Sequence, residues 1–253
     1  MNKKIINLAS MSDRGSNRPR PSEVMRNAWL ACRNLAAPQN ASETELVLYG
    51  EIGYDWWSDS GLTAKTVTDF LAKLPNGTTE ISVRINSPGG DVFEGVAMYN
   101  ALINSGLKVH VKIDALAASI ATVISMAGDT IEMAGNGQFM IHKAWTVAAG
   151  NADDMRSTAD LLDSIDSGSI ASTFGARTGL EESEILDLMK AETWFDAKAA
   201  KEKGFIDTIA DLKGKPKAPE ATESDANAKA EKAQLENSRL RNTHNKMRAR
   251  LAA

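Results

Sequence analysis

The sequence predicts an α/β fold in which helices cover a largely parallel sheet. In the middle of the chain, short segments with alternating apolar residues take turns with longer segments whose apolar residues recur at helical spacing. A β-α-β-α-β order of this kind favours parallel strands joined by right-handed crossovers. We expect one such domain at residues 43–211, between an N-terminal arm (1–42) and a charged tail (212–253).

Five segments are expected to be strands because they are rich in apolar and β-branched residues and are bounded by turn residues. They are 45–52, 80–86, 107–113, 129–134 and 137–142. The segment 53–61, GYDWWSDSG, predicts a loop. Between the strands, Thr63 is the predicted N-cap of a helix that continues to Leu74, and a second helix is expected at 92–103.

The last third of the domain is predicted to be mainly helical. A long helical stretch is expected within 150–177, where Asn151 suits the N-terminus. A shorter helix is expected at 181–189. A final helix is expected to begin at Asp196, an N-cap residue, and to stop at Gly204.

Composition excludes several classes of function. The chain of 253 residues has a formal net charge of −4, which does not favour a nucleic-acid partner or an anionic membrane. Cys32 is the only cysteine, so an intrachain disulfide and a multi-cysteine metal site are excluded. The longest apolar run, 115–127, is too short to span a bilayer. We expect a cytoplasmic protein with no metal, no cofactor, no nucleic-acid partner and no membrane anchor.

The tail 212–253 lacks aromatic residues and is dominated by charged residues, asparagine and alanine. Apolar residues seven positions apart form a weak heptad pattern, which would suit a self-associating helix. A solvated charged helix or a disordered segment is an equally open interpretation.

The stretch 114–128, DALAASIATVISMAG, is apolar and rich in small residues, and it follows a predicted strand. We expect the chain to turn from strand to helix near Ala117, which places Ser119 at the turn. Ser119 has two interpretations on this evidence. It is either a small residue tolerated in tight packing or a nucleophile whose hydroxyl faces a cleft.

Three histidines are candidates for a catalytic base. His110 lies within a predicted strand and His244 lies in the charged tail, so structural and solvated roles are expected for them. His142 ends the apolar strand QFMI, where a sheet holds a side chain rigidly at the edge of a cleft. His142 is therefore the candidate base.

The loop INSPGGDVFEG (85–95) leads from a predicted strand into a helix. Pro88 fixes one backbone dihedral, and Gly89-Gly90 permits conformations closed to other residues. Backbone N–H groups at such a helix start attract an anion, either phosphate or a developing oxyanion. The glycine spacing does not fit the Walker or dinucleotide patterns.

Three motifs in register carry a resemblance to a known family. The segments INSPGGDVFEGVAMYNAL, DALAASIATVISMAGD and FMIHKAW strongly resemble the Clp protease proteolytic subunit (ClpP) family of serine peptidases. The resemblance extends from about Leu46 to Asp207. It implies a crotonase-like spiral of β-β-α units and a Ser-His-acid mechanism of peptide-bond cleavage.

Variant details are most similar to the phage and prophage branch of this family, whose members are head-maturation (prohead) proteases in viral capsid assembly. The segments concerned are GDTIEMAGN, GNADDMR and ETWFDAKAAKEKGFID. The resemblance also implies a homo-oligomeric ring with active sites facing an internal chamber. The long helix after Gly150 would be the handle through which rings associate.

The resemblance assigns Ser119 as the nucleophile, His142 as the general base and Glu192 as the third member of the triad. The family has aspartate at the position of Glu192, so this chain orients its histidine through a longer arm. The resemblance assigns no metal ligand.

Five further residues are assigned by the same resemblance. Gly90 and Ile120 supply the backbone N–H groups of the oxyanion hole, and Gly89 shapes the turn. Asp91 and Val92 belong to the strand edge to which a substrate peptide adds itself.

The predicted function is an ATP-independent serine endopeptidase that processes scaffold or capsid proteins in phage head maturation, with no ATPase partner evident. One alternative is a related enzyme on the same fold that acts on acyl-CoA thioesters, but the pair Ser119 and His142 argues against it. The other alternative is a catalytically vestigial scaffold or assembly component. The charged tail supports that second alternative.

Overall fold

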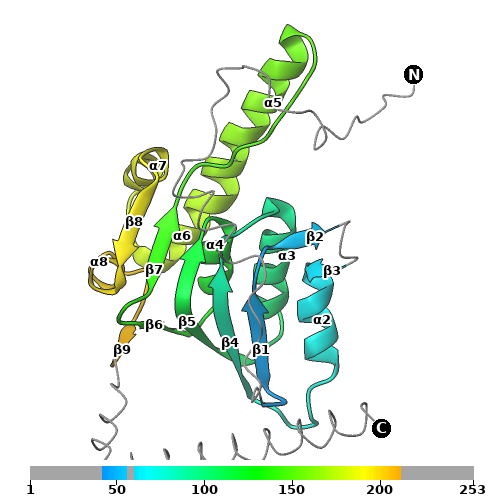
Figure 1. Cartoon of the computed structure of the whole chain (residues 1–253), viewed down its shortest axis with the longest axis vertical. Helices are drawn as coiled ribbons and strands as arrows, with labels where there is room; N and C mark the ends of the chain where they lie inside the picture. The colour runs from blue at the N-terminus through cyan, green and yellow to red at the C-terminus, as the bar shows by residue number, and fades with distance from the viewer. Residues whose placement is uncertain (1–41, 56–59, 212–253) are drawn as a thin grey trace, which may run out of the picture. The chain divides into compact units, whose positions relative to one another are not determined.

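The structure, a computed structural model, describes residues 42–55 and 60–211 (Figure 1). The predicted tail, and the predicted arm except for Ser42, lie outside these residues. Within the described part, no helix combines the length and the apolar character needed to cross a bilayer.

A mixed sheet of seven strands forms the centre of the described residues (Figure 1). The strand order is β1-β4-β5-β6-β9, with β7 beside β5 and β8 beside β7. All pairs are parallel except β7 with β8, as expected for a largely parallel sheet. The strands are β1 (Glu45–Tyr49), β4 (Glu80–Ser87), β5 (Lys108–Ala118), β6 (Thr130–Ala134), β7 (Gln138–Ile141), β8 (Thr193–Asp196) and β9 (Thr208–Ala210).

Strand β5 changes neighbours along its length, and this change fixes where it ends. Its first half pairs with β6, whereas its last three residues pair with β7, where Ala118 lies opposite Met140. On the other side, Ala117 lies opposite Ser87 at the end of β4. Strand β5 therefore ends between two other strands, and Ser119 is the next residue.

Helices occupy one face of the sheet, where α3 and α4 pack side by side (Figure 1). Helix α5 extends beyond the end of the sheet (Figure 1). The helical segments are α2 (Ala64–Ala72), α3 (Val92–Ile103), α4 (Ile120–Ser125), α5 (Ala152–Ser164), a π-helical segment (Ile165–Ala171), α6 (Ser172–Thr178), α7 (Glu182–Lys190) and α8 (Ala197–Glu202).

The core lies between the sheet and the helices that pack against it. Alternate residues of β4 (Ile81, Val83 and Ile85) are buried, and every residue of α4 is buried. At the far end of the sheet, four phenylalanines stack with ring centroids 5.0 to 6.3 Å apart and tie β7 and β8 to the helices. They are Phe139, Phe174, Phe195 and Phe205.

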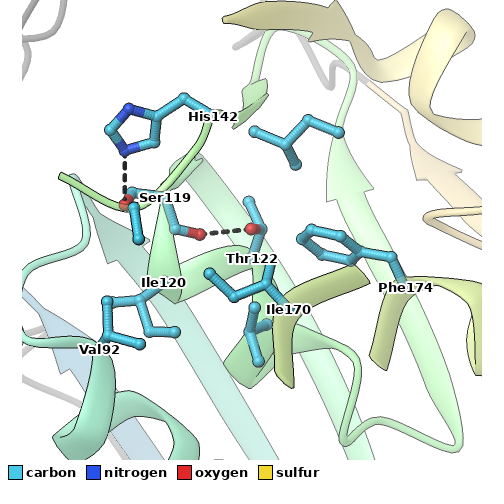
Figure 2. A pocket seen from close by; sticks show the side chains of 10 residues that line it. Val92, Ser119, Ile120, Thr122, His142, Ile170 and Phe174 are labelled. Atoms are coloured by element: carbon cyan, nitrogen blue, oxygen red, sulfur yellow. Dashed lines mark hydrogen bonds between the residues drawn. The ribbon is translucent and has the colours of Figure 1, made fainter. Parts of the chain in front are cut away.

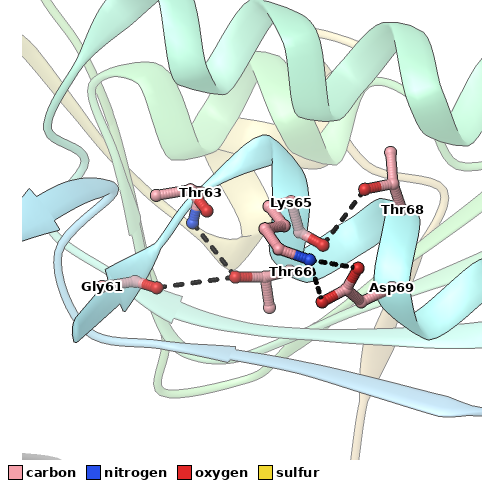
Figure 3. Close-up of polar contacts among 6 residues, drawn as sticks. All are labelled: Gly61, Thr63, Lys65, Thr66, Thr68 and Asp69. Carbon is pink, nitrogen blue, oxygen red and sulfur yellow. Dashed lines mark hydrogen bonds and ion pairs between the residues drawn. The ribbon is translucent and has the colours of Figure 1, made fainter.

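Helix α2 begins at the predicted cap. The Thr63 N–H donates to Thr66 Oγ1 at 3.1 Å, and Lys65 Nζ reaches both carboxylate oxygens of Asp69 at 2.6 Å (Figure 3). The first contact satisfies a backbone donor at the helix start, and the second is an i,i+4 pair on the exposed side. The other predicted caps are confirmed too, since Asn151 begins α5 and Asp196 begins α8.

The opposite face of the sheet is polar, and a cluster of hydrogen-bonded side chains there joins strands β1, β4 and β5. Tyr49 on β1 donates to Asp114 Oδ2 at 2.6 Å, and Arg84 on β4 donates to both Asp114 oxygens at 2.8 Å. Burial, followed by the hydrogen bond and the charge of Asp114, raises the pKa of Tyr49 to about 12. The phenol therefore stays protonated and holds its bond at any physiological pH.

Four sequence expectations are corrected here. The predicted loop 53–61 forms in part an antiparallel hairpin of β2 (Gly53–Asp55) and β3 (Ser60–Leu62). Strand β5 continues to Ala118, because pairing on both of its edges outweighs the helix propensity of its alanines. The segment before α8 first pairs with β7 as strand β8, and a π-helical segment interrupts the long helical stretch.

Candidate active site

Ser119 occupies a sharp turn between β5 and α4. Its backbone has φ 56° and ψ −131°, a conformation that costs a residue with a side chain of order 1–3 kcal/mol. The Ser119 N–H donates to the Met140 carbonyl at 2.9 Å, which holds the turn against β7. A strained strand-to-helix turn presents the hydroxyl outward, as a nucleophile requires.

Ser119 Oγ lies 2.8 Å from His142 Nε2 (Figure 2). The two other hydroxyls of the stretch face the backbone: Thr122 donates to the Ser119 carbonyl, and Ser125 donates to the Thr122 carbonyl at 2.6 Å. The hydroxyl of Ser119 is thus distinguished from its neighbours by its partner, and the candidate nucleophile and the candidate base are within hydrogen-bonding distance of each other.

His142 follows the last residue of β7 and is half-buried. Burial lowers the pKa of its imidazole, while the negative charges of Glu192 and then Asp166 act in the opposite direction. Because the net direction is downward from 6.5, the imidazole is neutral at pH 7 and is able to accept the Ser119 proton.

Glu192 lies between α7 and β8, and its negative charge acts to raise the pKa of His142. Its role as the third member of a triad stays a prediction. Its backbone has φ 50°, which is uncommon for a residue with a side chain. The Trp194 indole N–H donates to Glu192 Oε1 at 3.4 Å. The turn and the indole contact restrain the Glu192 carboxylate.

The glycine pair lies directly against Ser119, the candidate nucleophile. A Cβ on Gly89 would stand 2.6 Å from Ser119 Cβ and 3.2 Å from Ile120 N, so the loop and the start of α4 are in contact. A Cβ on Gly90 would stand 1.9 Å from the Ile52 carbonyl oxygen. Both positions thus require glycine, and the N–H of Ile120 belongs to the first residue of a helix, which has no partner inside the helix.

Asp91 and Val92 lie at the start of α3. The Asp91 carboxylate accepts the Glu94 N–H at 2.9 Å as the helix cap, and the Asp91 N–H donates to the Ile52 carbonyl at 2.8 Å. Asp91 is therefore engaged with its own chain here, and pairing of a substrate peptide at this edge stays a prediction. Val92 lines the pocket beside Ser119.

A small apolar pocket adjoins Ser119 and His142 (Figure 2). Its volume is about 10 Å³, enough for about one water molecule, so side chains have to move before a substrate side chain enters. Ile170 and Phe174 line it from the π-helical segment and α6. The sequence predicted a helical stretch here, but nothing in it showed that these two side chains reach Ser119.

Asp166 is a further residue that the sequence did not reveal. It is a buried acid within the helical stretch, and nothing in the sequence distinguished it from the other acidic residues there. In the described residues, no three His, Cys, Asp or Glu side chains are placed to hold a metal ion.

Comparison with known proteins identifies the family. The Clp protease family model matches residues 56–213, which is more than half of the chain, so the chain belongs to the Clp protease family. The ATP-dependent Clp protease proteolytic subunit of Bacteroides fragilis is 28% identical over 132 residues, 51% of this chain and 63% of that protein. Less than two thirds of that relative's length is therefore matched.

Two further likenesses agree with this family. The ATP-dependent Clp protease proteolytic subunit 2 of Tropheryma whipplei is 24% identical over 160 residues, 60% of this chain and 88% of that protein. A solved structure of a ClpP1 mutant from Listeria monocytogenes has a TM-score of 0.57 at 22% identity, covering 68% of this chain and 93% of that one. The structural likeness confirms the predicted ClpP-like α/β fold class.

Proposed function

We propose that this protein is a serine endopeptidase whose nucleophile is Ser119. The observation that carries the proposal is the 2.8 Å contact between Ser119 Oγ and His142 Nε2 at a strained strand-to-helix turn. Membership of the Clp protease family supports the same chemistry. An enzyme that acts on thioesters through an oxyanion hole alone does not require a serine nucleophile paired with a histidine base, so the pair Ser119 and His142 favours the peptidase.

The residues suit acyl transfer. His142 Nε2 takes the Ser119 proton while Ser119 Oγ bonds to the peptide carbonyl carbon, and the N–H groups of Gly90 and Ile120 hold the resulting oxyanion. His142 then gives the proton to the leaving amine, and the C–N bond breaks. Water, deprotonated by the same imidazole, releases the acyl group and restores Ser119. Glu192 stabilises the imidazolium that forms in each half.

We assign the substrate to scaffold or capsid proteins of a phage head, and the site of action to the cytoplasm of the host. The variant segments GDTIEMAGN, GNADDMR and ETWFDAKAAKEKGFID support this assignment through their resemblance to the phage and prophage branch. A homo-oligomeric ring is part of the proposal. A protease enclosed with its substrates needs no unfolding ATPase, although the relatives compared above are named ATP-dependent.

The test is cleavage of an unfolded protein such as casein by the full-length protein, with Ser119→Ala and His142→Ala as comparisons. The oligomeric state is measured in the same sample by light scattering. The proposal expects cleavage without ATP that either substitution lowers by about 10⁶, the loss measured for such residues in a serine protease. Cleavage that survives in Ser119→Ala refutes it, and so does an assembled wild-type protein that cuts nothing.

A further inference from the structure

Asp166 is a buried carboxylate for which the triad has no role. It lies in the π-helical segment Ile165–Ala171, and only 2% of its surface is exposed. Burying an ionised carboxylate costs several kcal/mol unless hydrogen bonds and an opposite charge offset the loss of water. A residue kept at this cost therefore has specific partners, and these partners indicate its role.

The partners of Asp166 are the two residues that follow the candidate base. Asp166 Oδ1 accepts the Ala144 N–H at 2.8 Å, and Asp166 Oδ2 lies 3.4 Å from Lys143 Nζ. Beyond the end of β7, two hydrogen bonds hold the backbone that follows His142: Lys143 N–H donates to the Met189 carbonyl at 3.2 Å, and Ala144 N–H donates to Asp166. Because Ala144 is two residues from His142, the hydrogen bond to Asp166 restrains the backbone that carries the imidazole.

The π-helical segment is suited to this task. Widening the helix by one residue changes which side chains point inward, and such segments are frequent at functional sites. In this segment Asp166 faces the chain after His142, while Ile170 lines the pocket beside Ser119. One irregular segment therefore contacts the base-bearing loop and the candidate substrate pocket.

We propose that Asp166 is a positioning residue for His142, which it holds toward Ser119 through the Ala144 N–H and the Lys143 ammonium group. The inference rests on the proposed function, because it needs His142 to act as a base. Asp166 acts through the backbone and through its charge and does not touch the reacting atoms.

Charge gives this role a measurable signature. The charged groups near the imidazole are Glu192 from the turn before β8, Asp166 from the π-helical segment, and Lys143, which is itself paired with Asp166 and Asp163. Both Glu192 and Asp166 favour the imidazolium form. Loss of the Asp166 charge therefore lowers the pKa of His142 and moves the acid limb of reactivity to lower pH. The same loss slows the plateau rate, because the imidazolium of the transition state is less stabilised.

The experiment measures the rate of Ser119 labelling by a fluorophosphonate probe from pH 4 to pH 9 in the full-length protein. Asp166→Asn keeps the size of the side chain and an oxygen for the Ala144 N–H but removes the charge. Asp163→Asn is the matched control, because Asp163 also lies 3.4 Å from Lys143 Nζ, is 77% exposed and is not bonded to Ala144 N. Asp166→Ala removes both the charge and the hydrogen bond.

We expect Asp166→Asn to shift the midpoint of the acid limb to lower pH and Asp163→Asn to leave it unchanged. Asp166→Ala is expected to lower the plateau rate by about a hundredfold, the effect of misplacing a catalytic group by about 1 Å. The midpoint does not depend on how much of a variant is folded, so partial unfolding does not imitate the shift. An unchanged midpoint in Asp166→Asn overturns the inference, whereas failure of the wild-type protein to label at Ser119 overturns the proposed function.

Discussion

Substitution of Gly89 by alanine tests how closely the glycine loop sets the position of Ser119. The added Cβ would stand 2.6 Å from Ser119 Cβ and 2.7 Å from the Ala118 carbonyl oxygen, whereas ordinary contacts begin at 3.4 Å. Neither neighbour is the free end of a flexible side chain, so Ser119 has to shift by about 1 Å. A displacement of this size costs about 10² in rate, and we expect that loss in Ser119 labelling.

Gly77→Ala is the control for the backbone term. Gly77 has φ 85° and Gly89 has φ 91°, so both substitutions incur a similar conformational cost of roughly 1–2 kcal/mol. A Cβ on Gly77 meets nothing within 4 Å, so Gly77→Ala is expected to lower the free energy of unfolding and leave labelling unchanged. Urea unfolding and labelling kinetics are measured on both variants. If Ser119 in Gly89→Ala is labelled at the wild-type rate, the packing argument is refuted.

Substitutions at two further residues test Glu192 and the polar face of the sheet. Glu192→Gln removes the largest electrostatic contribution that raises the pKa of His142, so the acid limb of labelling should move to lower pH and the plateau rate should fall. Glu192→Asp should keep a measurable part of the labelling rate. Full activity in both variants would exclude Glu192 as the orienting acid. Asp114→Asn weakens the bonds to Tyr49 and Arg84 and should cost about 1–2 kcal/mol in urea unfolding, with the partial exposure of the pair taken into account. In the same variant, ultraviolet titration should show the phenol of Tyr49 ionising below pH 12; an unchanged titration would contradict the assigned bond.

Most of the order of strands and helices in the domain could be predicted from the sequence, because those elements follow from local periodicity and capping. Thr63, Asn151 and Asp196 are N-caps as predicted, and the side chains of Asn151 and Asp196 accept N–H groups of their helices. Strand β8 was missed because its pairing with β7 is a long-range contact between segments more than fifty residues apart. The extension of β5 was missed for the same reason, since only its neighbours keep the alanines extended.

The candidate site could be predicted where each residue sits at the end of an element. Ser119 and His142 follow adjacent parallel strands, so strand order alone brings them together. Asp166 could not be found in this way, because its inward orientation depends on a π-helical segment that has no clear sequence signature. The role of Glu192 was inferred from a motif, and its influence on His142 became apparent only through the arrangement of α7 and β8.

The central claim is that Ser119 is a nucleophile activated by His142. Its most direct test is mass spectrometry of the assembled full-length protein after fluorophosphonate treatment at pH 7. We predict one adduct, on the peptide that contains Ser119, absent in Ser119→Ala and strongly reduced in His142→Ala. An adduct on another serine, or labelling that His142→Ala leaves unchanged, would contradict the claim.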